Sequence, residues 1–100
     1  MTLNINFEMM PFNEAVIELL VNKMNALSKK HEWLKKVMIN FKREILEPKN
    51  IDICEITLET VAENYKIVAT SGKISSATQE AVLDLKLLIR NRERKFVACV

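Results

Sequence analysis

The sequence predicts a mainly α fold, namely a small helical bundle built on a long, heptad-patterned helix, intact or broken, after a short N-terminal extended segment. Three observations support this prediction. Residues 12–47 contain no glycine and no proline. Apolar residues recur in that stretch at alternating spacings of three and four, which is the period of a helix. The 100-residue chain has one glycine, Gly72, whereas tight β-hairpins favour glycine.

Length and composition indicate one soluble domain spanning residues 1–100. Hydrophobic residues make up 49% of the chain and charged residues 28%, which is ordinary for a globular protein. The N-terminus lacks the pattern of a signal peptide, and no apolar run approaches the ~20 residues of a membrane span. We therefore expect a cytoplasmic protein with no membrane contact, in which Cys54 and Cys99 are free thiols.

The N-terminal segment, residues 1–10, has the alternation of a strand with one buried face. Leu3, Ile5, Phe7 and Met9 alternate with polar residues. A strand and an extended arm along a helix both fit this pattern. As a strand it needs a neighbour, which a second copy of the chain could supply.

Residues 12–47 are predicted to form one long helix, and a helical hairpin broken near Ser28 is the alternative. Pro48 ends this segment because proline disfavours the α conformation in the residue before it. His31 is the only polar residue of the repeat. It could set the register of a coiled coil, but we favour a partly exposed position at the edge of the seam or at a break. The repeat consists of Ile17, Leu20, Met24, Leu27, His31, Leu34, Met38, Phe41 and Ile45.

The second half of the chain is predicted to form two further helices. Residues 51–70 fit a helix that ends before Gly72, and two strands turning through Ala62–Asn64 are the alternative. Residues 76–95 fit a helix that starts with a capping box at Ser76 and Gln79. The last five residues, 96–100, form an apolar tail.

Apolar residues remain outside each assigned core face, and such second stripes indicate burial against another chain. We therefore predict a non-enzymatic adaptor, chaperone or inhibitor that presents helix faces to a protein partner or to itself as a homodimer. The expected contacts are Ile39, Leu46, Ile53, Ile56, Leu83 and Leu87.

Charge provides the alternative function, a nucleic-acid-binding transcriptional regulator. The net charge of the chain is +2, but basic residues gather in the long and last helices, as polyanion contacts would. Glu55, Glu59 and Glu63 form an acidic row that is either solvated or paired with the Lys35/Lys36 and Lys42/Arg43 face. The candidate polyanion contacts are Lys29, Lys30, Lys35, Lys36, Lys42, Arg43, Arg90, Arg92 and Arg94, and Lys95 extends the last cluster.

No catalytic, cofactor or metal site is predicted. One histidine and two distant cysteines do not complete a zinc site. Ser71-Gly72-Lys73 resembles the end of a phosphate loop, but position 67, where that motif needs glycine, holds Ile67. No nucleophile with an adjacent base can be recognised, so we expect no enzymatic activity.

Overall fold

The computed structural model describes residues 1–98, with side chains through Arg94. The elements in chain order are β1 (Thr2–Glu8), α1 (Glu14–Lys30), β2 (Lys36–Leu46), β3 (Lys49–Glu59), β4 (Asn64–Ser71) and α2 (Ile74–Ala98). The strands form one sheet in the order β1-β2-β3-β4, in which β1 is parallel to β2 and the other pairs are antiparallel. The predicted all-helical bundle is therefore wrong, and the fold is α/β.

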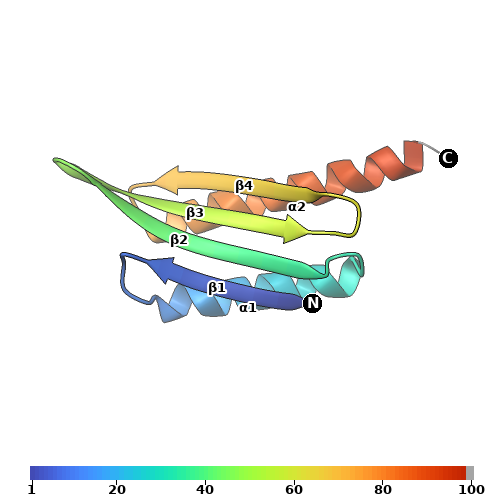
Figure 1. Cartoon of the computed structure of the whole chain (residues 1–100), viewed down its shortest axis with the longest axis horizontal. Helices are drawn as coiled ribbons and strands as arrows, with labels where there is room; N and C mark the ends of the chain where they lie inside the picture. The colour runs from blue at the N-terminus through green and yellow to red at the C-terminus, as the bar shows by residue number, and fades with distance from the viewer. Residues whose placement is uncertain (99–100) are drawn as a thin grey trace.

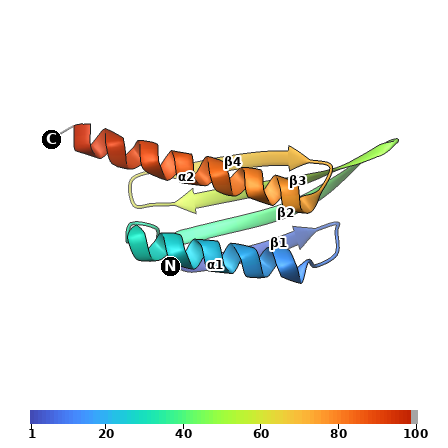
Figure 2. The same cartoon turned by 180° about the vertical axis from the view of Figure 1, so that it is seen from behind.

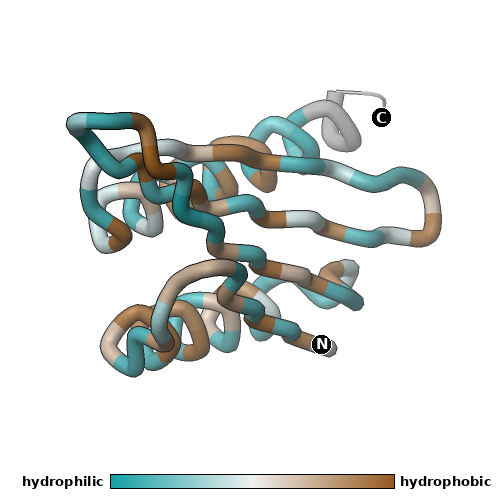
Figure 3. Tube along the Cα trace, turned by 60° about the vertical axis from the view of Figure 1, so that its left-hand side comes forward, coloured by the Kyte–Doolittle hydropathy of each residue, from teal (hydrophilic) through white to brown (hydrophobic). Residues whose placement is uncertain are grey.

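The molecule has two layers, because both helices cover the same face of the sheet (Figures 1 and 2). Hydrophobic and hydrophilic residues alternate along the strands (Figure 3), so that each strand turns one apolar row toward the helices. That row includes Val37, Ile39 and Phe41 of β2 opposite Leu58, Ile56 and Cys54 of β3. Neither helix covers the other face of the sheet, which we call the open face.

The alternating N-terminal segment is a strand, β1, and its neighbour belongs to the same chain. Leu3, Ile5 and Phe7 lie beside Val37, Ile39 and Phe41 in the parallel register. The rings of Phe7 and Phe41 stack with centroids 4.8 Å apart. A second copy of the chain is therefore not needed to complete this part of the sheet.

The predicted long helix is wrong beyond Lys30. Asn13 caps α1 by accepting a hydrogen bond from the Val16 backbone N–H at 3.1 Å, and the backbone N–H of His31 closes the other end. Beyond that end, Met38 and Phe41 belong to the strand β2 and point to opposite faces of the sheet. The three–four repeat therefore continues in sequence across a change of structure, and it forms no coiled-coil seam.

The predicted helix over residues 51–70 is also wrong, and the hairpin alternative is correct. β3 and β4 are joined by a turn in which the Thr60 hydroxyl donates to the Glu63 carbonyl at 2.6 Å and accepts from the Glu63 N–H at 3.0 Å. A side chain closes this turn, so no glycine is required. Gly72 lies between β4 and α2 without a positive φ, so it is no helix cap.

The last helix is predicted well. Its buried side chains are Ala77, Thr78, Ala81, Val82, Leu85 and Ile89, most of them on the expected face. The helix begins at Ile74, so Ser76 lies inside its first turn and is no cap. The side chains of Lys95 and Phe96, and the end of the tail with Cys99, lie outside the described residues.

β2 and β3 extend beyond their neighbours as a two-stranded arm. β1 pairs only as far as Lys42, and β4 only as far as Asp52. At the base of the arm the Arg43 Nε donates to the buried carboxylate of Asp52 at 2.7 Å. The arm lengthens the molecule, whose principal extent is 52 Å.

Candidate functional site

The two helices run in the same direction, which brings their C-terminal ends together. Both start near the same end of the sheet, as Figure 2 shows. At the other end, the Nδ1 atom of His31, the residue after α1, contacts the Glu93 carboxylate of α2. Residues about sixty positions apart in sequence therefore share one end of the helical layer.

This arrangement separates the charges of the helical layer. The N-terminal halves of the helices expose Glu14, Glu18, Glu80 and Asp84. The C-terminal halves expose Lys23, Lys29, Lys30, Lys86, Arg90 and Arg94. The N-terminal half of the layer is therefore mainly acidic and the C-terminal half mainly basic, where Glu93 contacts His31 and Glu32 is exposed in the loop after α1.

Five exposed cations form what we call the basic end: Lys29, Lys30, Lys35, Arg90 and Arg94. Lys35 lies in the loop between α1 and β2, where its carbonyl accepts a hydrogen bond from the Thr2 N–H at 2.8 Å, at the start of the β1–β2 pair. Among the side chains described, none of the observed ion pairs involves these five residues. Their charges face solvent and are available to a polyanion.

A cluster of side chains fixes the geometry of the basic end. The Arg92 guanidinium lies over the Trp33 ring, 3.9 Å from its centroid. The Trp33 and His31 rings meet edge to face at 6.3 Å. The hydrogen bond from the Tyr65 hydroxyl to Glu63 raises the pKa of Tyr65, and the Arg92 guanidinium partly opposes this shift. The predicted polyanion contact Arg92 is thus a structural residue that ties α2 to the sheet.

The other predicted polyanion contacts lie away from the basic end. On the open face of the sheet, the Lys36 ammonium pairs with Glu59 at 3.6 Å, and that of Lys42 pairs with Glu55 at 3.3 Å. Arg43 holds Asp52, whose hydrogen bond raises the Arg43 pKa. The suggested pairing of the acidic row with these cations is confirmed for Glu55 and Glu59, and it follows from the β2–β3 register.

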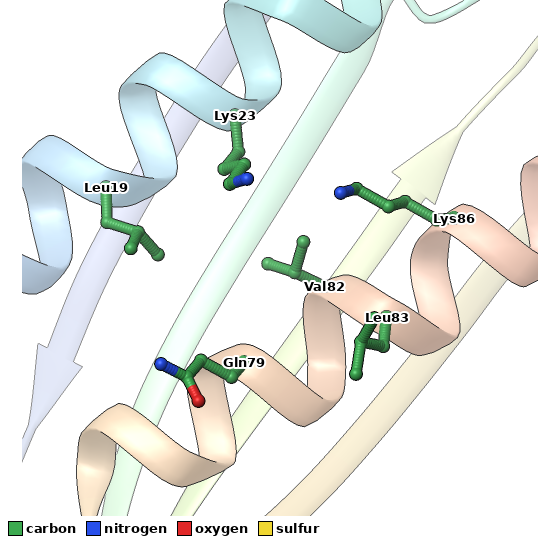
Figure 4. Close-up of a pocket in the computed structure, with 6 residues that line it drawn as sticks. All are labelled: Leu19, Lys23, Gln79, Val82, Leu83 and Lys86. Carbon is green, nitrogen blue, oxygen red and sulfur yellow. The ribbon is translucent and has the colours of Figure 1, made fainter.

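A groove runs between the two helices, with side chains of both along its walls (Figure 4). We call it the inter-helix groove; it has a volume of about 320 Å³ and is lined by Leu19, Lys23, Gln79, Val82, Leu83 and Lys86. A narrower part of about 180 Å³ continues past Leu19 and Gln79 toward Asn13 and Ser75. The Lys23 and Lys86 side chains reach toward each other across the groove (Figure 4).

The predicted interface residues do not form one surface. Ile39 and Ile56 are buried in the core between sheet and helices, and Ile53 is half-buried on the open face. Leu46 is exposed on the arm, far along the chain from α2. Only Leu83 and Leu87, 61% and 53% exposed, lie on one accessible face. The helical stripe pattern failed for the first group because those residues alternate along strands.

The described residues hold no cluster of metal-ligating side chains. Cys54 is a free thiol, but burial raises its pKa to about 12, with a smaller contribution from Glu55, so it remains protonated and unreactive at neutral pH. None of the described helices is long and apolar enough to cross a membrane.

Two solved structures share this fold. A ribosomal subunit interface protein from Coxiella burnetii superposes with a TM-score of 0.79 at 13% identity, covering 94% of this chain and 99% of the other. The N-terminal domain of Protein Y from Thermus thermophilus superposes with a TM-score of 0.71 at 13% identity, covering 91% and 98%. The sequence matches no protein-family model and no curated protein. The resemblance therefore concerns the fold.

The sequence identified Lys29, Lys30, Lys35, Arg90 and Arg94 as candidate contacts but could not show that they share one end. It did not single out Lys23 and Lys86, which line the inter-helix groove together with Gln79. The available signal was the acidic-to-basic change along each helix, which becomes informative once the helices are known to be parallel.

Proposed function

We propose that this chain is a non-enzymatic, cytoplasmic protein that binds ribosomal RNA at a subunit interface of the ribosome, using its basic end as the contact. The observation that carries the proposal is the gathering of five exposed cations from α1, α2 and the Lys35 loop at one end of the molecule. Phosphate contacts by lysine and arginine supply most of the affinity of such binding.

The shared fold supports the ribosome as the source of that RNA. A protein with this architecture over nearly its whole length is described as a ribosomal subunit interface protein. A ribosome also suits a contact that reads charge and shape, because structured RNA presents phosphates and ribose hydroxyls rather than an open major groove. Transcriptional regulation through a helix in the DNA major groove is less suited, because α1 and most of α2 lie along the sheet (Figure 1).

Sedimentation with purified ribosomal subunits tests the proposal. We expect the chain to sediment with bacterial subunits at low salt and to be released as salt rises, with the steep dependence of phosphate contacts. Lys30→Glu with Arg90→Glu should weaken binding about tenfold or more, because two favourable phosphate contacts become repulsive.

Lys49→Glu with Lys73→Glu is the matched control. It changes the net charge by the same amount at two exposed positions on the arm and at the start of α2. We expect this control to bind within about twofold of the parent protein, because long-range charge effects are screened beyond ~10 Å at ordinary salt. Equal losses in both variants, or no sedimentation of the parent protein, would contradict the proposal.

A second candidate function, contact with a protein, rests on the exposure of Leu87 on α2. If this side chain meets a ribosomal protein, Leu87→Glu should weaken binding to intact subunits and leave binding to protein-free ribosomal RNA unchanged. Equal binding of Leu87→Glu and the parent protein to intact subunits would remove this contact from the proposal.

A further inference from the structure

We propose that the inter-helix groove is a nucleotide site, in which an unstacked base of the bound RNA lies between α1 and α2 while Lys23 and Lys86 hold its adjoining phosphates. This inference rests on the proposed function and deepens it, since it names the structural feature of RNA that the protein recognises. The cations of the basic end alone would not distinguish an unstacked base from a paired one.

The lining of the groove has the mixed chemistry that a nucleotide requires. Leu19, Val82 and Leu83 supply apolar walls from both helices. Leu19 and Leu83 are 37% and 61% exposed, so these walls are open to an incoming group, whereas Val82 is buried at the base. The volume of about 320 Å³ lies at the lower end of the ~300–1,000 Å³ of small-molecule sites, which suits a nucleobase.

The polar groups stand where the remainder of a nucleotide would lie. Gln79 carries an amide, both donor and acceptor, and it points across the groove toward α1 (Figure 4). An amide can pair with the edge of a base in this way. Lys23 and Lys86 approach the groove from opposite sides, and among the described residues neither takes part in an ion pair.

Two facing ammonium groups without a carboxylate repel each other, so an anion between them relieves that repulsion. The acidic residues of the two helices, namely Glu14, Glu18, Glu80, Asp84 and Glu93, do not line the groove. The occupant is therefore anionic next to the lysines and apolar in its body. A nucleotide in RNA meets both conditions, and Lys23 and Lys86 lie on the same two helices that carry the cations of the basic end.

The test uses three RNA hairpins with identical stems: one fully paired, one with a single bulged adenosine, and one with an abasic residue at the bulge. We expect the bulged hairpin to bind about tenfold more tightly than the abasic one. A 2-aminopurine in place of the bulged adenosine should change its fluorescence on binding, because the base moves from solvent to an aliphatic site.

Leu19→Ala with Leu83→Ala should abolish the preference for the bulge and leave the affinity for the abasic hairpin unchanged, because no charge is altered. Leu87→Ala is the matched control, since Leu87 is exposed on the same helix but does not line the groove. Lys23→Gln with Lys86→Gln should weaken binding of the bulged hairpin more than that of the paired one.

Equal affinity for the bulged and abasic hairpins would overturn this inference and leave the proposed function intact. Binding to none of the hairpins, together with no sedimentation on ribosomal subunits, would overturn both. If an acidic amphipathic peptide binds through Leu19 and Leu83 while the three RNAs bind alike, the groove is a protein site and the inference is wrong.

Discussion

The guanidinium of Arg92 lies 3.9 Å from the centroid of the Trp33 ring, and this contact joins α2 to the loop after α1. We expect Arg92→Ala to lower the free energy of unfolding by about 1–2 kcal/mol, because a desolvated cation–π contact is worth about that much. Urea denaturation measures the loss. Trp33 is the only tryptophan, so its emission reports the same contact directly.

Arg90→Ala serves as the control for that experiment. Arg90 is an exposed neighbour on α2, so its removal should leave the Trp33 emission and the unfolding free energy within about 0.5 kcal/mol of the parent protein. A Trp33 emission that is unchanged in Arg92→Ala would contradict the role assigned to this contact.

The pair of Arg43 and Asp52 at the base of the arm predicts a larger effect. Asp52 is 4% exposed, so Arg43→Leu leaves a buried carboxylate without its partner. We expect a loss of about 2–3 kcal/mol, below the about 3–5 kcal/mol of a fully buried pair, because solvent reaches part of the Arg43 side chain. Arg43→Leu with Asp52→Leu should recover part of this stability.

Lys42→Leu is the comparison for the arm. Its partner Glu55 is 3.3 Å away on the open face of the sheet, and such a surface pair is worth at most about 1 kcal/mol. Chemical denaturation of the variants should therefore rank Arg43→Leu as the more damaging change. The reverse ranking would mean that the arm does not depend on the pair at its base.

The pKa of Tyr65 reports on the side-chain cluster around Arg92 that fixes the geometry of the basic end. Its pKa is raised chiefly by the hydrogen bond from its hydroxyl to Glu63, at 2.6 Å, and Arg92 opposes that shift. We expect Glu63→Gln to lower the Tyr65 pKa and Arg92→Ala to raise it further. Because Tyr65 is the only tyrosine, absorbance titration of the phenol measures both shifts without assignment. Equal titration curves for the three proteins would show that neither Glu63 nor Arg92 interacts with the Tyr65 hydroxyl.

How far the sequence predicts the fold depends on whether its signals are local. The strand β1 and the helix α2 have one clean period each; α2 is predicted as a helix, and a strand is one of the two alternatives that the sequence leaves for β1. The strand β2 was not, because its buried alternation Val37, Ile39, Phe41 is interleaved with the helical spacing Leu34, Met38, Phe41. Over so short a stretch the two periods share residues, and tertiary pairing with β1 and β3 decides between them.

The β3–β4 hairpin shows why an absent glycine misleads. Its four-residue turn is closed by the Thr60 side chain, whereas the two-residue turns that favour glycine are only one way to connect strands. Hairpin formation was therefore possible with residues that also suit a helix.

The candidate site was predictable in composition but not in arrangement. The cations Lys29 and Arg90 were identified from sequence as polyanion contacts, yet only the parallel packing of α1 and α2 places them together. Conversely, Lys36 and Lys42 have the same local appearance but lie opposite Glu59 and near Glu55 across the sheet. The sequence does not give the strand register, and the register decides which of these cations form ion pairs.

The raised pKa of the Cys54 thiol predicts that the stability of the protein falls at alkaline pH. Burial, and secondarily the Glu55 charge, raises its pKa from 9.0 to about 12 in the folded protein. Above pH 9 the unfolded chain loses this proton and the folded chain keeps it. The thiol's contribution to stability is therefore intact below about pH 9 and falls by about 1.4 kcal/mol per pH unit until about pH 12.

Unfolding free energies of the parent protein and Cys54→Ala, measured at pH 8 and pH 10.5, test this expectation. Cys54→Ala is less stable at pH 8 because it leaves a cavity, but it should lose less stability on going to pH 10.5. Tyr65, whose pKa is raised chiefly by its hydrogen bond to Glu63, is present in both proteins, so the difference between them isolates the thiol. Parallel pH profiles for the two proteins would show that Cys54 is not held in its protonated form by the core.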